Sequence, residues 1–305
     1  MTLTELRYIV ALARERHFGR AADKCAVSQP TLSVAVKKLE DELGVALFER
    51  APNEVRVTEI GGRIVTQAEK VLAEASRVAE LAATGKDPLS GPLRLGCIYT
   101  IGPYLLPRLV PLLRERAPTM PLIIEENFTE RLIAKVKNSE LDIAVLALPI
   151  DEPGLVAQPV YDEQLRVLLP VGHPLTKEKT VAPMALLDTP LLMLGPGNCF
   201  RDQVLDLCAR ATDQAGTSPH ILEGSSLETI RLMVASGVGC TVMPASAVDG
   251  ITARDPLLRV RPFTEPTPSR RVGLVWRASY PRHKAIDVVR RALLDCKLPG
   301  TKVAK

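Results

Sequence analysis

The hydrophobic residues of this chain repeat with one period before residue 86 and with another after residue 92. The segment between them, KDPLSGP, contains proline, serine and glycine, which are typical of a linker. Before the linker, apolar residues recur every three or four positions, as they do on a helix. After it, short apolar runs typical of strands alternate with helical patterns. We therefore predict a mainly helical part, a linker and an α/β part.

Residues 1–58 predict three helices followed by a hairpin, the order found in a winged helix-turn-helix. Thr2 and Glu5 have the spacing of a capping box at the start of the first helix. The segment FGRAADKCA predicts the second helix. Ser28 is a good N-cap for the third helix. The segment VALFERAPNEVRVT then predicts two short strands that are joined by a Pro-Asn turn.

The third helix is expected to bury one face and expose another. Leucine and valine recur at spacings of 4, 3 and 4, which predicts one buried stripe. That stripe consists of Leu32, Val36, Leu39 and Leu43. The residues off the stripe are polar and can form hydrogen bonds; they are Gln29, Thr31, Ser33 and Lys37. Such side chains can reach base edges or phosphates in a major groove.

Residues 59–88 predict a long helix that links the two parts. Small and branched apolar residues recur along it at a spacing close to the 3.5 residues of a coiled-coil seam. They are Ile60, Ile64, Ala68, Val71, Ala75, Val78 and Ala82. We expect this helix to dimerise, because no other core is near it in the sequence. The alternative is that it packs against its own domain.

Residues 89–305 predict an α/β domain of two lobes. Strands at 93–98, 121–127 and 141–148 alternate with helices at 102–116 and 129–138, which gives a parallel sheet. Lobe I is expected at about 89–162 and 269–305, and lobe II at about 163–268. A cleft between the lobes would accept a small ligand at the carboxyl ends of the strands.

Composition narrows the classes of function. The net charge of +4 permits nucleic-acid binding without arguing for it. The opening residues lack the pattern of a signal peptide, and no stretch resembles a membrane span, so we expect a cytoplasmic protein without a membrane partner. The six cysteines show neither CxxC nor metal-ligand spacing, which predicts no disulfide framework, no metal and no cofactor. Four of them, Cys25, Cys97, Cys240 and Cys296, are expected to be inert small hydrophobes.

Cys199 and Cys208 lie on one predicted helix, nine residues apart. At about 1.5 Å per residue they are roughly 13–14 Å apart along it. A disulfide requires Cα atoms within about 7 Å. Either the two thiols never meet, or the helix must come apart for them to meet.

Several segments resemble the LysR-type transcriptional regulators over essentially the whole chain. The segment FGRAADKCAVSQPTLSVAVKKLEDELGVALFER looks like their DNA-binding domain, and SGPLRLGCIYTIGPYLLPRLVP looks like the start of their effector domain. CFRDQ with Cys208, YTIGPYLLP and SSLETIRLMVASG resemble the hydrogen-peroxide-sensing branch of that family. The resemblance implies a tetrameric DNA-binding activator of oxidative-stress genes whose effector domain has a periplasmic-binding-protein-like fold.

The resemblance also implies roles for individual residues. Cys199 would react with peroxide and Cys208 would be its disulfide partner. The peroxide site would contain Thr100, Thr129, Asp202, His220 and Arg271. The DNA contacts would come from Gln29, Pro30, Thr31, Ser33, Lys37, Lys38, Arg50 and Arg56.

The chain departs from the family pattern at two places. Asn198 stands before the reactive cysteine, where these regulators commonly have histidine. The wing carries Pro52 and Glu54, although it is usually basic.

The chemistry expected of Cys199 follows from its position. It comes after GPGN, a turn that ends in a good N-cap, and so should begin its helix. The positive helix end and a nearby cation such as Arg201 favour a thiolate. A thiolate that attacks peroxide becomes a sulfenic acid, which needs a second thiol. Unwinding the helix to supply it would make the disulfide easier to reduce.

The family match also implies partners. We expect RNA polymerase, self-association as a homodimer or homotetramer, and a thiol reductant such as glutaredoxin or thioredoxin. Two other functions remain open. One is a LysR-type regulator with a small organic inducer in the cleft and an inert cysteine pair. The other is a thiol peroxidase, against which the DNA-binding domain speaks, so we predict that the chain is not an enzyme.

Overall fold

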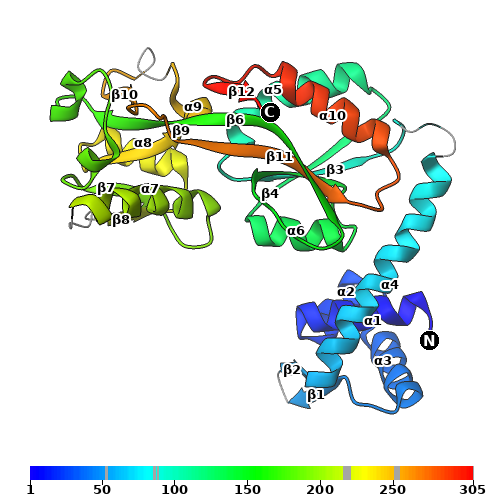
Figure 1. Cartoon of the computed structure of the whole chain (residues 1–305). Coiled ribbons are helices and arrows are strands. Elements are labelled where there is room, and N and C mark those ends of the chain that lie inside the picture. The colour runs from blue at the N-terminus through cyan, green and yellow to red at the C-terminus, as the bar shows by residue number, and fades with distance from the viewer. Residues whose placement is uncertain (52–53, 85–86, 88, 216–220, 251–254, 305) are drawn as a thin grey trace. The chain divides into compact units, whose positions relative to one another are not determined.

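The computed structural model describes residues 1–51, 54–84, 87, 89–215, 221–250 and 255–304. It divides into two compact units, Met1–Gly85 and Lys86–Lys305 (Figure 1). Among the described residues, no helix is both long and apolar enough to cross a membrane.

The first unit has the predicted order of three helices, a hairpin and a long helix. Its elements are α1 (Leu3–Glu15), α2 (Phe18–Lys24), α3 (Gln29–Leu43), β1 (Phe48–Ala51), β2 (Glu54–Val57) and α4 (Glu59–Thr84). The capping box at Thr2 and Glu5 is confirmed, because each side chain bonds the other's backbone N–H. Ser28 caps α3 by accepting a hydrogen bond from the N–H of Thr31.

The buried stripe of α3 is shorter than predicted. Leu32, Val36 and Leu39 lie in the core, but Leu43 is 37% exposed. Leu43 is the last residue of α3, and Gly44 turns the chain there with a φ of 70°. The helix therefore ends before its fourth stripe residue can be enclosed.

The long helix α4 packs partly on its own unit. Val65 and Ala68 are buried in the core of the first unit, and Arg14 of α1 donates a hydrogen bond of 2.9 Å to Glu69. The predicted seam therefore divides between two faces. Ala68 faces the domain core, whereas Val71 and Val78 remain exposed in this single chain.

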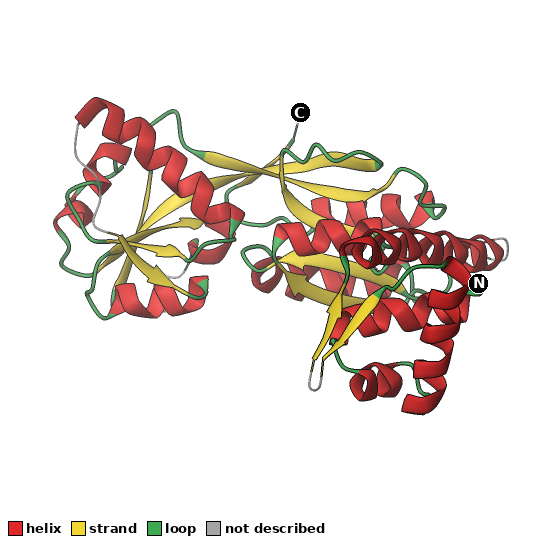
Figure 2. Ribbon diagram, turned by 90° about the horizontal axis from the view of Figure 1, so that it is seen from below, coloured by secondary structure: helices red, strands yellow, loops and turns green. Residues whose placement is uncertain are grey.

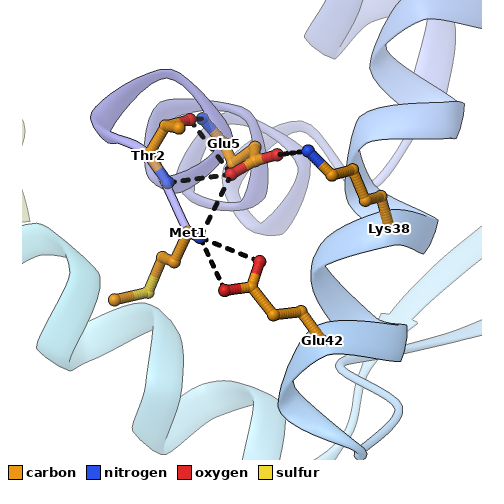
Figure 3. Close-up of polar contacts among 5 residues, drawn as sticks. All are labelled: Met1, Thr2, Glu5, Lys38 and Glu42. Carbon is orange, nitrogen blue, oxygen red and sulfur yellow. Dashed lines mark hydrogen bonds and ion pairs between the residues drawn. The ribbon is translucent and has the colours of Figure 1, made fainter.

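A carboxylate joins α1 to α3 inside the first unit (Figure 3). Glu5 accepts hydrogen bonds from the Thr2 backbone at 2.8 Å and from Nζ of Lys38 at 3.3 Å. The hydrogen bonds from Thr2 and Lys38 lower the pKa of Glu5. Beside it, the amino group of Met1 contacts Glu42 of α3 at 2.6 Å. These contacts orient the first helix against the third.

The second unit contains two lobes with helices on both sides of their strands (Figure 2). Lobe I is built from β3 (Leu93–Ile98), α5 (Gly102–Arg116), β4 (Leu122–Asn127), α6 (Thr129–Lys137), β5 (Ile143–Leu148) and α10 (His283–Asp295). Lobe II is built from β7 (Leu191–Leu194), α7 (Cys199–Ala215), β8 (Ile221–Gly224), α8 (Leu227–Ala235), β9 (Cys240–Pro244), α9 (Ala245–Val248) and β10 (Leu258–Pro262). Short β12 (Thr301–Val303) and two 3-10 turns, Pro174–Lys177 and Pro183–Leu186, complete the unit.

The lobes have the predicted parallel strand cores. In lobe I, β3 lies between β4 and β5 and is parallel to both. In lobe II, β7 lies between β8 and β9 and is parallel to both. The carboxyl ends of neighbouring parallel strands meet at one edge of each sheet. The loops after β3 and β4 therefore come together.

Two long antiparallel strands run through both lobes. They are β6 (Leu155–Pro170) and β11 (Ser269–Arg277), which pair from Leu155↔Arg277 to Gln164↔Ser269 (Figure 1). In the sequence, only the apolar run LRVLLP, the last six residues of β6, predicts a strand. The first part was missed because it mixes polar and apolar residues and contains Pro159, where the register shifts between Val272 and Gly273.

We predict different costs for two leucines of α3. Leu39→Ala should lower the free energy of unfolding by about 2–5 kcal/mol, because it opens a cavity in a core. Leu43→Ala is the matched control and should cost about 0.5 kcal/mol or less, as expected for a surface site. Urea titration of the whole chain, followed by helical circular dichroism, measures both. Equal losses would contradict the short stripe.

Candidate functional site

Three loops of the second unit converge through one aromatic side chain. Phe128, which precedes α6, stacks edge-on against Tyr99 with ring centroids 5.4 Å apart. A side chain at Gly197 would bring its Cβ within 3.9 Å of the Phe128 ring. Gly197 has a φ of 87° and lies two residues before α7. The loops that carry Thr100, Thr129 and Cys199 are therefore neighbours.

Thr100 is held by a buried arginine, Arg270. Nη1 of Arg270 donates to Oγ1 of Thr100 at 2.9 Å, and Nη2 donates to its carbonyl oxygen at 2.9 Å. Nε and Nη2 of Arg270 both lie 2.8 Å from Oε2 of Glu163. Both charged side chains are 1% exposed. A buried pair of this kind fixes the guanidinium strongly, since loss of either partner leaves an uncompensated charge.

Arg271, which the sequence placed in the site, is not joined to this group by these contacts. It pairs with Asp162 on the opposite face of the strand, at 2.7 and 2.9 Å, and is exposed. The hydrogen bond from Arg271 lowers the pKa of Asp162. Successive residues of a strand point to opposite faces. The register sets Arg270 opposite Glu163 and Arg271 opposite Asp162, so the two arginines point to opposite faces of β11.

Two further side chains near these loops have polar atoms without partners. Oγ1 of Thr129 is buried and has no hydrogen-bond partner among the described residues. The same holds for Oε1 of Gln203, which lies one turn after Cys199 on α7. Leaving such an atom buried and unpaired costs about 1–3 kcal/mol. Neither group is a satisfied cap or turn residue, and both remain available to a small polar ligand.

Gln203 was not predicted as a site residue. The one sequence signal for it is its spacing of four from Cys199, which puts both on one helix face. Glu126, at the end of β4, was also missed. Burial raises the pKa of Glu126, and its carboxylate lies so close to Gly102 that a Cβ at that position would force the carboxylate to shift.

Cys199 and Cys208 contact different lobes. Cys199 is the first residue of α7, is half-buried and packs against the core of lobe I. Cys208 is buried in the core of lobe II, and burial raises its pKa to about 11. The helix is continuous between them, so about 13–14 Å separates the two positions. All six cysteines of the structure are thiols.

The remaining residues around Cys199 shape its loop. Asn198 donates from Nδ2 to the carbonyl of Gly195 at 3.0 Å. Arg201 donates to the carbonyl of Leu194 at 2.8 Å and pairs with Glu223 at 2.7 Å, so its guanidinium supports the loop from the lobe II side.

Two other predicted members of the site are not joined to it by these contacts. Asp202 is exposed in the first turn of α7, and among the described residues no hydrogen bond joins it to either threonine. His220 lies outside the described residues. Within those residues, no group of three or more histidine, cysteine or acidic side chains could hold a metal.

The predicted DNA-binding residues lie mostly on the surface of α3. Gln29, Pro30, Thr31 and Lys37 are exposed, and Ser33 is half-buried. Lys38 is 70% exposed but reaches back to Glu5. In the wing, Arg56 is exposed, whereas Pro52 and the side chains of Arg50 and Glu54 lie outside the described part of the chain.

Each of the two units matches a known protein family. The family "LysR substrate binding domain" matches residues 86–296, and "Bacterial regulatory helix-turn-helix protein, lysR family" matches residues 3–62. The chain is 40% identical to the "DNA-binding transcriptional dual regulator OxyR" of Escherichia coli K12, over 97% of this chain and 96% of that protein. It is 37% identical to the "Hydrogen peroxide-inducible genes activator" of Haemophilus influenzae, over 97% of both chains.

Solved structures are similar as well. A full-length cysteine-to-aspartate variant of OxyR from Pseudomonas aeruginosa has a TM-score of 0.78 and 52% identity, and the match covers 98% of this chain and 99% of that one. A cysteine mutant of Corynebacterium glutamicum OxyR, bound to H2O2, has a TM-score of 0.65 and 35% identity, with 97% and 92% covered.

We predict that the two neighbouring arginines of β11 differ in importance. Arg270→Met should lower the free energy of unfolding by about 3–5 kcal/mol, because Glu163 is left buried and unpaired. Arg271→Met, one residue away, breaks an exposed pair and should change stability little. Urea titration of both variants compares them directly. A larger loss for Arg271→Met would reverse the assignment of the two faces.

Proposed function

The chain belongs to the LysR family of bacterial transcription regulators and is a homologue of OxyR over 97% of its length, and on that premise we propose that Cys199 is its peroxide sensor and Cys208 its disulfide partner. The protein is a DNA-binding regulator that activates transcription in response to hydrogen peroxide. The observation that carries the proposal is the meeting of Thr100, with its buried arginine, and the loops of Thr129 and Cys199 at the first turn of α7.

The reaction proceeds in two balanced steps. The thiolate of Cys199 attacks one oxygen of H2O2, the O–O bond breaks, and hydroxide leaves and takes up a proton as water. Cys199 is thereby oxidised by two electrons to a sulfenic acid. The thiol of Cys208 then attacks that sulfur, the S–O bond breaks, and water leaves with the thiol proton. The products are one disulfide and two water molecules for each H2O2.

Hydroxyl groups and an arginine orient the peroxide. Because Arg270 donates to Oγ1 of Thr100, the threonine's own proton remains free to bond a peroxide oxygen. The unpartnered hydroxyl of Thr129 supplies a second donor or acceptor, and Oε1 of Gln203 supplies an acceptor. Asp202 and His220 remain proposed members of this site, and Arg270 takes the place of Arg271.

Because of its buried position, Cys208 takes part only in forming the disulfide and not in the reaction with peroxide. With a pKa of about 11, it stays protonated in neutral solution and does not compete with Cys199 for peroxide. It becomes a partner only after the sulfenic acid forms and the start of α7 unwinds. That loss of helix makes the disulfide easier to reduce, which allows a cellular reductant to reset the switch.

The DNA-binding unit acts through α3 and self-association. Gln29, Thr31 and Ser33 contact base edges, and the basic residues Lys37 and Arg56 contact phosphates. The domains are proposed at 1–58, 59–88 and 89–305. Exposed apolar residues of α4, including Val71 and Val78, form the contact between two chains. RNA polymerase and a glutaredoxin or thioredoxin complete the partners, in the cytoplasm.

The decisive experiment is peroxide-dependent footprinting on DNA from upstream of the protein's own gene. We expect Cys199→Ser to bind this DNA but to lose the change of footprint that peroxide causes. Cys240→Ser removes another buried thiol of lobe II and should keep the change. If the Cys199→Ser variant still changes its footprint with peroxide, Cys199 is not the sensor, and an organic inducer in the cleft is favoured instead. Repeated peroxide turnover with thioredoxin would instead favour a thiol peroxidase.

A second prediction concerns base recognition. Gln29→Ala should weaken specific DNA binding roughly tenfold or more, because one good side-chain contact to a base is worth about 1–3 kcal/mol. Its melting temperature should not change, since Gln29 is exposed. Gln67→Ala, at an exposed glutamine of α4, is the matched control. Fluorescence anisotropy with specific and scrambled duplexes measures the effect. Equal loss on both duplexes would mean that Gln29 contacts only the backbone.

A further inference from the structure

The residue after Cys199 ties the start of α7 to the buried arginine. The ring of Phe200 lies against the guanidinium of Arg270, with its centroid 5.3 Å from Cζ. Phe200 is 2% exposed and belongs to the core of lobe II. A cation over a desolvated aromatic ring is attracted to it more strongly than at an exposed site. Two interactions therefore hold Phe200 in place: the burial of its ring in the core of lobe II and the contact of that ring with Arg270.

The position of Phe200 in the reduced protein is incompatible with a disulfide between Cys199 and Cys208. Their Cα atoms must approach from roughly 13–14 Å to about 7 Å or less. Cys208 is buried nine residues inside a helix that continues to Ala215, whereas Cys199 is its half-buried first residue. The end of a helix opens more easily than its interior. The Cys199 end must therefore move, by at least about 6 Å.

Phe200 has to move with it. Phe200 lies eight residues before Cys208 on the same helix, so their Cα atoms are about 12 Å apart. Consecutive Cα atoms are about 3.8 Å apart, so with Phe200 in place Cys199 could come no nearer to Cys208 than about 8 Å, which is too far for a disulfide. The ring then leaves both the core of lobe II and the face of Arg270. We propose that Phe200 is the latch of the thiol switch: its ring holds the start of α7 in the reduced protein, and its release sets the reduction potential of the Cys199–Cys208 disulfide. This inference rests on the proposed function.

The direction of the effect follows from the state in which Phe200 is held. A weaker latch destabilises the reduced protein and leaves the disulfide form unchanged. The equilibrium constant for disulfide formation then rises, and the potential becomes more negative. Phe200→Leu removes the aromatic face and part of the buried area. We expect about a tenfold larger constant, which corresponds to about 30 mV for two electrons.

The test is a redox titration of the full-length chain in buffers of reduced and oxidised glutathione, with thiols alkylated and the 199–208 disulfide quantified by mass spectrometry. Phe200→Met keeps most of the volume without the ring and should shift the potential in the same direction as Phe200→Leu. Phe263→Leu is the matched control. Phe263 is also 2% exposed in the core of lobe II, but it lies next to Val181 and outside the segment that moves.

The outcomes distinguish an effect of Phe200 on the reduction potential from a general loss of stability in lobe II. A more negative potential in both Phe200 variants, with Phe263→Leu at the wild-type value, supports the latch. Unchanged or less negative potentials at 200, or an equal shift in Phe263→Leu, overturn it. If Phe200→Leu does not fold, Phe200→Met alone decides between these results. A wild-type chain that forms no 199–208 disulfide overturns the proposed function, and the latch with it.

Discussion

The buried ion pair between Arg270 and Glu163 is the interaction on which the rest of the candidate site depends. Two charges that are 1% exposed are tolerated only when nearly every donor and acceptor is used. Arg270 meets this demand through Glu163, through both oxygens of Thr100 and through the face of Phe200. The other oxygen of Glu163 accepts the N–H of Ser246 at 3.0 Å, at the start of α9. One charge pair thus fixes the loop after β3, the start of α7 and a turn of lobe II.

The pair also explains how a local oxidation can reach both lobes. Cys199 packs against lobe I, whereas Phe200, the next residue, packs into lobe II and onto Arg270. Any movement at the start of α7 therefore changes contacts in both lobes at once. Packed cores respond to such a change by switching between discrete arrangements and not by bending gradually. The thiol pair therefore has a physical route to the remainder of the effector unit.

Acidic residues organise the DNA-binding unit in a similar way. Glu40 near the end of α3 accepts hydrogen bonds from the N–H groups of Leu47 at 2.7 Å and Phe48 at 3.1 Å, which fixes the start of the wing. Glu5 ties α1 to Lys38 of α3. These carboxylates are used inside the domain and lie away from the first turn of α3. Residues 1–58 contain nine Lys or Arg and eight Asp or Glu, so the domain is nearly neutral. That balance is compatible with a polar, acid-free surface at Gln29 and Thr31.

The sequence by itself determined the features that depend on residues close to one another in the chain. The capping box at Thr2, the N-cap at Ser28 and the alternation after residue 92 all depend on near neighbours, and the spacing of Cys199 and Cys208 follows from helix geometry alone. Tertiary structure decided what depends on distant partners. Leu43 continues the periodic stripe but has no core around it, and Gln203 becomes a site residue only because its oxygen is enclosed without a partner. Arg270 and Arg271 are chemically identical neighbours in the sequence. Only the pairing register of β11 with β6, which alternates faces at every residue, sends Arg270 inward to Glu163 and Thr100 and Arg271 outward to Asp162.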